Sequence, residues 1–456
     1  MKNLFDDFNP VSSKQWKQQI QFELKGADYN ETLVWNSPED IQVKPFYHKD
    51  EFAGSASVKT KATHFRICQN IFVKDVKKSN GRAIDSINRG AESLRFTIED
   101  EKINLAKLLQ NLPLDDITIY FNLSFLSIDF IKKIALLAQE KKAKIYCNLD
   151  PIGQLAKEGN WFSTQEKTNF DTLNEVLKII PSGVSGLISI NASLYQNAGA
   201  NMVQQIAYAL AHANEYFNRV SDLNQPLVFE VSVGTNYFFE MAKLRALRLL
   251  FHRIAKEYNH NFDCHIMVSP TKRNKTLYDY NVNMLRTTTE CMSAILGGAD
   301  VIANLPYDSL YHKDNEFGDR IARNQLLVLK HESHFDKVNN PTDGSYYIES
   351  LTNQLAEKAL TLFKDIEANG GFLKQLNDGI VKRKIQESAD KEQELFDAGK
   401  EVLLGTNKYP NKKDLMKDNL ELFPFLKIKP RKTLISPIIE KRLAEKVEQE
   451  RLKEEN

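Results

Sequence analysis

The stretch of sequence that decides the fold runs from residue 281 to 349 and opens with NVNMLRTTTECMSAILGGADVIANLPYD (281–308). It continues through RIARNQLLVLKHESHF (320–335) and closes with NPTDGSYYIE (340–349). These patterns predict a helix capped by Gly297 and Gly298, a buried strand, a second long helix and a return to a strand. The order is typical of a cycle in which strands and helices alternate.

The same alternation extends over most of the chain. Periodic apolar patterns predict helices near 81–90, 103–110, 130–139, 171–180, 202–217 and 239–258. Between and after them, eight strands are expected at 94–98, 117–121, 144–149, 187–191, 227–233, 264–269, 301–304 and 335–339. Eight strand–helix units favour an α/β fold in which a parallel sheet closes into a (β/α)8 TIM barrel.

The segments outside this cycle suggest an arm and a tail around a barrel domain of residues 61–400. In residues 1–60, Ser12 and Gln15 form a capping-box pattern before a stripe of Trp16, Ile20 and Leu24. This arm has no core of its own, so we expect it to pack on the barrel or on a partner chain. A second apolar stripe at 351–366 predicts a helix that ends at the Asn-Gly-Gly of 369–371.

Residues 401–456 are expected to form a linker followed by a charged helical tail. The last 17 residues alternate Lys or Arg with Glu at short helical spacings. Such charge runs usually belong to a solvated helix or a frayed terminus.

Composition excludes several function classes. The 456 residues are 42% hydrophobic and 27% charged with a net charge of +1, which provides no basic surface for nucleic acid or anionic lipid. The N-terminus does not read as a secretory signal, and no apolar run is long enough to suggest a membrane span. Four cysteines lie far apart in sequence, which argues against structural zinc or a disulfide framework, and the expected location is cytoplasmic.

Three ordered segments carry a resemblance to a known family. They are residues 281–349, GTNYFFEMAKLRALRLL (234–250) and INASLYQNAGA (190–200). Together they resemble the barrel of the methylmalonyl-CoA mutase family, which interconverts methylmalonyl-CoA and succinyl-CoA with adenosylcobalamin. The resemblance also implies that KGADYNETLVW (25–35) belongs to an arm that wraps another subunit.

The resemblance places catalytic groups at positions where this chain has other residues. A Tyr linked with cobalt–carbon cleavage falls on Thr60, and an Arg-Gln step falls on Cys68-Gln69, although a slip of two residues would bring Arg66 to the Arg position. The His that stabilises charge on the substrate carbonyl falls on Met267. His265 shares a strand face with Met267 and could substitute for it, but a structural role is the commoner reading.

Substrate and cofactor groups are also replaced. The region that holds the acyl carboxylate reads NLDPIGQLAKEGNW (148–161), which offers Asp150 and Lys157 but no Arg and resembles the family's small, non-catalytic subunits. A run that meets coenzyme A in active members reads PLVFE from Pro226 to Glu230, which is apolar and acidic. The family's cobalt-ligating D-x-H-x-x-G is matched only by Asp263-Cys264-His265, read here as a coincidence on a barrel strand.

Three arginines on predicted helices are weighed separately. A substrate contact is conceivable for Arg286, Arg320 and Arg323, but an ion-paired helix surface or a subunit contact is the favoured interpretation.

The sequence therefore predicts a small, non-catalytic subunit of a heterodimeric, adenosylcobalamin-dependent isomerase of this family. No catalytic, cofactor-binding or metal-binding residue and no cobalamin-binding domain is expected on this chain. The expected partner is a large catalytic subunit that binds adenosylcobalamin and the acyl-CoA substrate. Two alternatives stay open: a catalytic barrel that works with a cobalamin domain on a separate chain, and an acyl-CoA binding module.

Overall fold

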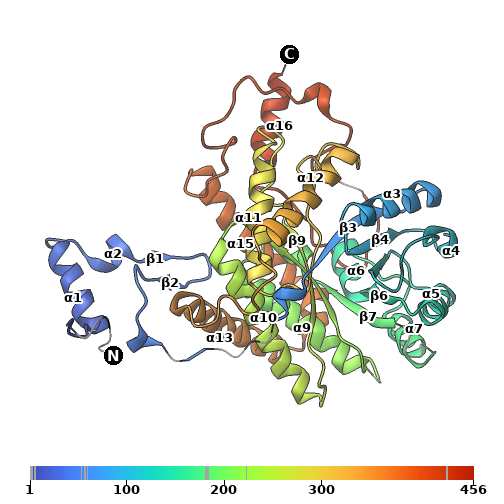
Figure 1. The fold of residues 1–456 in the computed structure, drawn as a ribbon, viewed down its shortest axis with the longest axis horizontal. Helices are drawn as coiled ribbons and strands as arrows, with labels where there is room; N and C mark the ends of the chain where they lie inside the picture. The colour runs from blue at the N-terminus through green and yellow to red at the C-terminus, as the bar shows by residue number, and fades with distance from the viewer. Residues whose placement is uncertain are drawn as a thin grey trace.

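Eight parallel strands close into a barrel in the computed structural model of this chain, which describes residues 4, 7–52, 54–55, 58, 60–179, 184–221, 223–427 and 430–455. Each strand pairs in parallel with its two neighbours, so the predicted TIM barrel is confirmed (Figure 1). In chain order the strands are β3 (Arg66–Phe72), β4 (Ser93–Ile98), β5 (Thr118–Leu123), β6 (Lys144–Leu149), β7 (Val184–Asn191), β8 (Val228–Val233), β9 (His265–Pro270) and β10 (Val301–Ile302).

Helices cover the outside of this barrel (Figure 1). Those up to β10 are α3 (Val76–Asn88), α4 (Leu105–Leu108), α5 (Ile128–Lys141), α6 (Pro151–Glu158), α7 (Glu166–Ile179), α8 (Ser193–Asn197), α9 (Met202–Arg219), α10 (Tyr237–Glu257) and α11 (Val282–Leu296). The predicted helices agree with these except at their ends. α3 begins five residues early because the side chain of Asp75 caps it by accepting from the amide of Lys78. Residue 180, the predicted end of α7, lies outside the described residues.

One predicted strand is wrong. Residues 335–339 form turns, and the helices that follow β10 run from α12 (Glu316–Leu327) through a π-helical turn (Val328–Glu332) to α13 (Tyr346–Ala368) without another strand. The eighth strand is instead β3, at the start of the barrel. Its sequence RICQNIF was not recognised because Arg66, Cys68 and Asn70 point into the barrel and break the apolar run expected of a buried strand.

The N-terminal arm is attached to its own barrel through a short hairpin. The arm consists of α1 (Ser13–Glu23), α2 (Tyr29–Leu33), the strands β1 (Trp35–Asn36) and β2 (Gln42–Val43), and the 3-10 turn Lys49–Glu51. A second 3-10 turn, Ala62–His64, leads into β3. Ile41, in the hairpin, is fully buried in the main core, and the Trp35 ring packs edge-on against Phe239 of α10. The hairpin therefore fixes the arm to the barrel wall.

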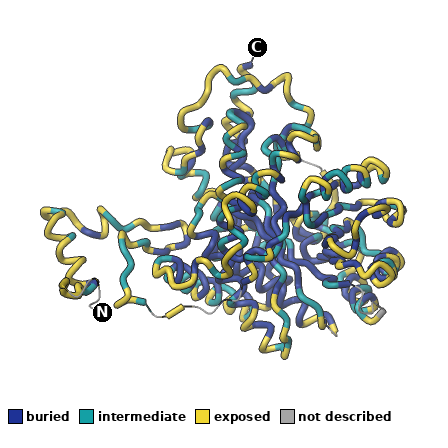
Figure 2. The backbone as a smooth tube through the Cα atoms, viewed as in Figure 1, coloured by how far each residue is buried: buried dark blue, intermediate teal, exposed yellow. Residues whose placement is uncertain are grey.

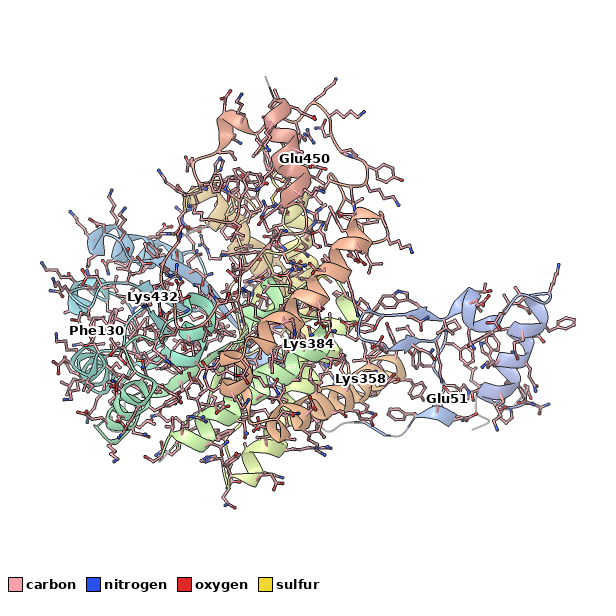
Figure 3. All side chains as sticks on the ribbon, turned by 180° about the vertical axis from the view of Figure 1, so that it is seen from behind. Glu51, Phe130, Lys358, Lys384, Lys432 and Glu450 are labelled. Atoms are coloured by element: carbon pink, nitrogen blue, oxygen red, sulfur yellow. The ribbon has the colours of Figure 1, made fainter. Side chains whose placement is uncertain are left out.

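Beyond the hairpin the arm projects away from the barrel (Figure 1). The capping box of Ser12 and Gln15 is confirmed at the start of α1. Most of this helix is exposed (Figure 2), including Trp16, which is 50% exposed, and Phe22, which is 80% exposed. Seen from behind, Glu51 of the arm lies further out than Lys358 of α13 (Figure 3). The part of the arm beyond the hairpin, including α1, therefore packs little against the barrel of its own chain.

The C-terminal part continues through α14 (Phe372–Asn377), α15 (Ile380–Asp397), the 3-10 turn Lys417–Asn419 and α16 (Glu445–Glu454). The prediction of a helical tail is confirmed, but the expectation that it is solvated is wrong for one face. Glu448 is 1% exposed, accepts from the amide of Leu277 at 2.7 Å and pairs with Arg442 at 2.6 Å. Among the residues described, no helix is both long and apolar enough to cross a membrane.

Candidate functional site

A cavity of about 480 Å³ opens at the carboxyl ends of the barrel strands. This is the end at which TIM-barrel proteins place their active sites, because loops and inward-facing side chains from all strands converge there. Alternate residues of a strand face the same side, so β8 directs Glu230 and Ser232 inward and β9 directs Met267 and Ser269 inward. The lining is mainly amides, hydroxyls and charged groups.

A hydrogen-bonded crossbar spans the barrel below this cavity. Arg95 of β4 donates from Nη1 to Glu230 Oε2 at 3.0 Å and from Nε to Asn70 Oδ1 at 2.8 Å. Asn122 of β5 donates to Glu230 Oε2 at 3.1 Å, and Asn148 of β6 donates to Glu230 Oε1 at 3.3 Å and to Asn122 Oδ1 at 2.9 Å. These side chains join strands on opposite sides of the barrel and fill its middle layer.

A stack of three rings fills the layer beneath the crossbar. The rings of Tyr120, Tyr146 and His265 lie nearly parallel, with centroids 4.7 Å apart for Tyr146 and His265 and 5.0 Å apart for the two tyrosines. Tyr120 and His265 share a hydrogen bond of 2.9 Å. Burial lowers the pKa of His265 to about 4, although Asp300, 3.8 Å away, opposes the shift. His265 is therefore neutral near pH 7.

Thr60, the first residue aligned with a catalytic group, lies at the opposite end of the barrel from the cavity. Its backbone amide donates to Asn340 Oδ1 at 2.9 Å, its hydroxyl contacts the same oxygen, and its methyl group packs against Gly298, which precedes β10. These contacts give Thr60 a structural role at the base of the barrel.

Cys68 and Met267 both lie inside the barrel, as their strand positions imply. Burial raises the pKa of the Cys68 thiol to about 11, so the group stays protonated. The Met267 sulfur accepts weakly from Arg95 Nη1 at 3.3 Å. His265 shares the inward face with Met267 as expected, but it lies one layer deeper, within the ring stack.

Asp150 and Lys157 both line the cavity, but their surroundings differ. Asp150 caps α6 and is turned away from solvent: Oδ1 accepts from Gly153 N, His212 Nε2 and Tyr216 OH at 2.7–2.9 Å. Burial alone would raise the pKa of Asp150, but the charge and hydrogen bond of His212 and the hydrogen bond of Tyr216 outweigh it and lower the pKa. Lys157 lies at the exposed rim of the cavity. The two residues therefore do not form a common anion site.

Two of the three arginines, Arg286 and Arg323, are buried and hydrogen-bond to uncharged groups, which differs from the ion-paired helix surface that was the favoured interpretation. Arg286 donates to Thr276, to Asn283 and to the carbonyl of Leu404, which fixes the C-terminal segment to α11. Arg323 donates to Gln69 Oε1 at 2.9 Å. The Arg320 guanidinium lies over the ring of Phe317 on the same helix.

The C-terminal segment contributes to the rim of the cavity. The amide of Ile438 donates to the carbonyl of Ala156 at 2.8 Å, and the amide of Leu443 donates to that of Arg273 at 3.0 Å. Between these two points, Glu440 accepts from Asn197 at 2.9 Å and lines the cavity. Sequence reasoning treated this segment only as a linker and tail.

Sequence reasoning also missed the residues of the crossbar, apart from Glu230, which it noted only as an acidic replacement. A signal was present: Arg95, Asn122 and Asn148 each stand at alternate positions among apolar strand residues. Polar residues at period two in a strand that is buried on both sides indicate a polar barrel interior. Which of these polar side chains contact one another depends on the registers between the strands.

Histidine and acidic side chains are the groups that would hold a cofactor or a metal ion. None of the nine histidines lines the mouth cavity among the residues described. His265 of the Asp263-Cys264-His265 match is enclosed in the ring stack, so the residues present do not fit a lower ligand for cobalt at the mouth. Over the same described residues, no three His, Cys, Asp or Glu side chains are grouped to hold a metal ion.

Comparisons with known proteins give a consistent result. The family model described as methylmalonyl-CoA mutase matches residues 97–450. The methylmalonyl-CoA mutase small subunit of Porphyromonas gingivalis is 32% identical over 462 residues, which cover 92% of this chain and 73% of that protein. The methylmalonyl-CoA mutase of Rhizobium meliloti is 30% identical, and the mitochondrial enzyme of Homo sapiens is 27% identical. The chain spans 64% and 61% of the lengths of these two relatives.

Proposed function

Because the chain belongs to the methylmalonyl-CoA mutase family, we propose that it is the small, non-catalytic subunit of an isomerase that interconverts methylmalonyl-CoA and succinyl-CoA. In this proposal a large catalytic subunit binds adenosylcobalamin and the acyl-CoA, and both chains work in the cytoplasm. The division into an arm of residues 1–60, a barrel of 61–400 and a C-terminal segment of 401–456 is part of the proposal.

The observation that carries the proposal is the filled barrel interior. The Arg95–Glu230 crossbar and the ring stack beneath it occupy two successive layers of the axis. Thr60, Cys68 and Met267, at the three positions aligned with catalytic groups, are engaged in structural contacts. Acid–base or radical chemistry needs a reacting molecule beside the catalytic side chains. The side chains of Thr60, Cys68 and Met267 have protein on all sides, which leaves no room for one.

The adenosylcobalamin that the family uses is assigned to the partner for a related reason. The mouth of this barrel has no histidine among its described lining residues, and His265, the histidine of the D-x-H match, is enclosed in the ring stack. We therefore derive no chemical step on this chain. Its role in the complex is to support the barrel of the large subunit.

The proposed role of the arm rests on its exposure and its anchorage. The hairpin around Ile41 fixes the arm to its own barrel, while Trp16 and Phe22 of α1 remain exposed. Large apolar side chains on a projecting helix gain most by burial against another molecule. We assign that molecule as the large subunit.

A turnover assay tests the catalytic part of the proposal. The purified chain, supplied with adenosylcobalamin and methylmalonyl-CoA, should form no succinyl-CoA, whereas the mixture with its large subunit should be active. Turnover by this chain alone would overturn the assignment and favour the catalytic alternative. In that case His265→Ala and Arg66→Ala should abolish the activity.

A binding assay tests the arm. The double variant Trp16→Ser with Phe22→Ser should reduce co-elution with the large subunit on size-exclusion chromatography. Leu136→Ser is the matched control, because Leu136 is 66% exposed on α5, away from the arm. Equal complex formation by both variants would contradict the assignment.

A further inference from the structure

The outward faces of the barrel helices differ in their charge. α3, α5 and α7 expose charged side chains such as Lys77, Lys133 and Asp171, as solvated helices do. α9 and the first half of α10 are buried, because α13 packs against both helices. α11 follows neither pattern: its two charged residues, Arg286 and Glu290, are buried, and its exposed and half-buried positions are all uncharged. The distribution of charge on α11 is thus the reverse of that on a solvated helix.

The outward side chains of α11 form a stripe along the helix. Leu285 is 68% exposed, Thr289 is exposed, and the other members of the stripe are half-buried. In order, the stripe consists of Val282, Leu285, Thr289, Met292 and Leu296, spaced alternately three and four residues apart. An uncharged stripe with this spacing is the surface with which one helix packs against another.

α12 adds a second stripe beside the first. Gln325 of α12 donates to the hydroxyls of Thr287 and Thr288 of α11 at 3.0 and 2.7 Å, so the two helices lie next to each other on the barrel wall (Figure 1). The outward side of α12 and of the turn after it carries Phe317, Ile321, Asn324 and Val328, at spacings of four, three and four residues. We call the two stripes together the α11–α12 face.

This face also carries one charged group without an ion-pair partner among the residues described. Arg320 is exposed and lies over the ring of Phe317, whereas the neighbouring Glu316 is engaged by Arg89. A single arginine among apolar side chains is typical of the centre of a protein–protein interface. The face therefore complements an uncharged surface that offers one acceptor to Arg320.

The partner of the α11–α12 face is another molecule. No described residue covers the face, and the undescribed residues of this sequence occur in runs of at most four, which is too short for a covering helix. The two stripes contain nine residues, whereas a stable interface takes about 20–30 residues on each side. A molecule bound here must therefore also contact another part of this chain.

The N-terminal arm is the nearest part that lacks a partner. Its hairpin packs on α10 through Trp35 and Phe239, and α10 packs in turn against α11. A molecule on the α11–α12 face consequently lies beside the root of the arm. The exposed Trp16 and Phe22 of the arm supply further apolar contacts for the same molecule.

We propose that the α11–α12 face is a docking surface for the large subunit, which the arm and this face hold together. The inference rests on the proposed function, because that function supplies the partner. The face packs against an uncharged helical side of the large subunit, and Arg320 donates to an acceptor there. Two stripes with spacings of three and four residues allow helices to pack at a crossing angle of about 20°.

Binding of the full chain to the separately produced large subunit, measured by biolayer interferometry, tests the face. Leu285→Glu and Val328→Glu should each weaken binding by about a hundredfold, because each places an unpaired charge in the interface. Leu136→Glu is the matched control. Leu136 is 66% exposed and Leu285 is 68% exposed, but α5 lies on the opposite side of the barrel from α11, so this variant should bind like the wild type.

The arginine is tested in the same assay. Arg320→Ala should weaken binding by about tenfold, whereas Lys133→Ala, which removes an exposed cation from α5, should leave it unchanged. Thermal unfolding of each variant alone shows that it is folded.

The outcomes separate this inference from the proposed function. Wild-type affinity in both glutamate variants would overturn the docking face and leave the subunit role intact. No binding by the wild-type chain would contradict the subunit role, and the docking face with it. Sedimentation equilibrium of the chain alone tests the other occupant: self-association that Leu285→Glu abolishes, with large-subunit binding retained, would assign the face to a second copy and overturn the proposal.

Discussion

The Arg95–Glu230 crossbar makes a quantitative prediction about stability. The two side chains are only 16% and 13% exposed, and their ion pair is joined by three asparagines. Replacing Arg95 by Met leaves the Glu230 carboxylate with amide donors only. Breaking one partner of a buried pair costs about 3–5 kcal/mol, and the amides that remain place this variant at the lower end, about 3 kcal/mol.

Equilibrium urea unfolding, monitored by far-UV circular dichroism, measures this cost. Glu230→Leu should be destabilised by a similar amount, because it leaves the guanidinium of Arg95 unpaired. The double variant should recover most of the loss, since apolar side chains of similar volume often replace a buried ion pair without penalty. A double-mutant cycle then gives a coupling free energy of about 2 kcal/mol or more.

An exposed ion pair provides the control. Lys374 and Asp378 lie four residues apart around the end of α14, with side chains 60% and 46% exposed. A double-mutant cycle with Lys374→Met and Asp378→Leu should give a coupling free energy of at most about 0.5 kcal/mol. If the Arg95 and Glu230 variants each lose less than about 1 kcal/mol and show no coupling, the crossbar does not hold the barrel interior closed.

Three further predictions concern other parts of the fold. Because burial depresses the pKa of His265 from 6.5 to about 4, the unfolded chain binds the proton more tightly. Stability from this group is therefore full above pH 6.5 and is lost as the pH falls toward 4, and urea midpoints of His265→Phe should fall less over that window. Gly298→Ala should lower the melting temperature more than Gly344→Ala does: both glycines have positive φ, but only at Gly298 would a Cβ collide with Thr60. Glu448→Ala should lower the free energy of unfolding by about 3 kcal/mol and speed tryptic cleavage of residues 401–442, measured by mass spectrometry. An unchanged cleavage rate would show that other contacts hold the C-terminal segment in place.

Much of the barrel follows from local pattern. The spacing of apolar residues predicts α9, α10, α13 and most strands, and short-range signals predict the capping box of Ser12 and the Gly297 C-cap. These features depend on residues within one or two turns, so they can be read without knowing the fold. The predictions failed at residues 335–339 and at β3, where the strand is polar on its inward face.

The sequence by itself determined the family and the alternation of strands and helices, and it predicted that Thr60, Cys68 and Met267 stand in place of the family's catalytic groups. Only the tertiary structure decided what fills the space they leave. Arg95 and Glu230 are 135 residues apart, and their meeting depends on barrel closure and on registers that set which inward positions share a layer. The buried face of α16 likewise depends on a contact between distant residues, because the amide of Leu277 donates to Glu448. Local pattern specifies elements, whereas contacts between distant elements specify the interior.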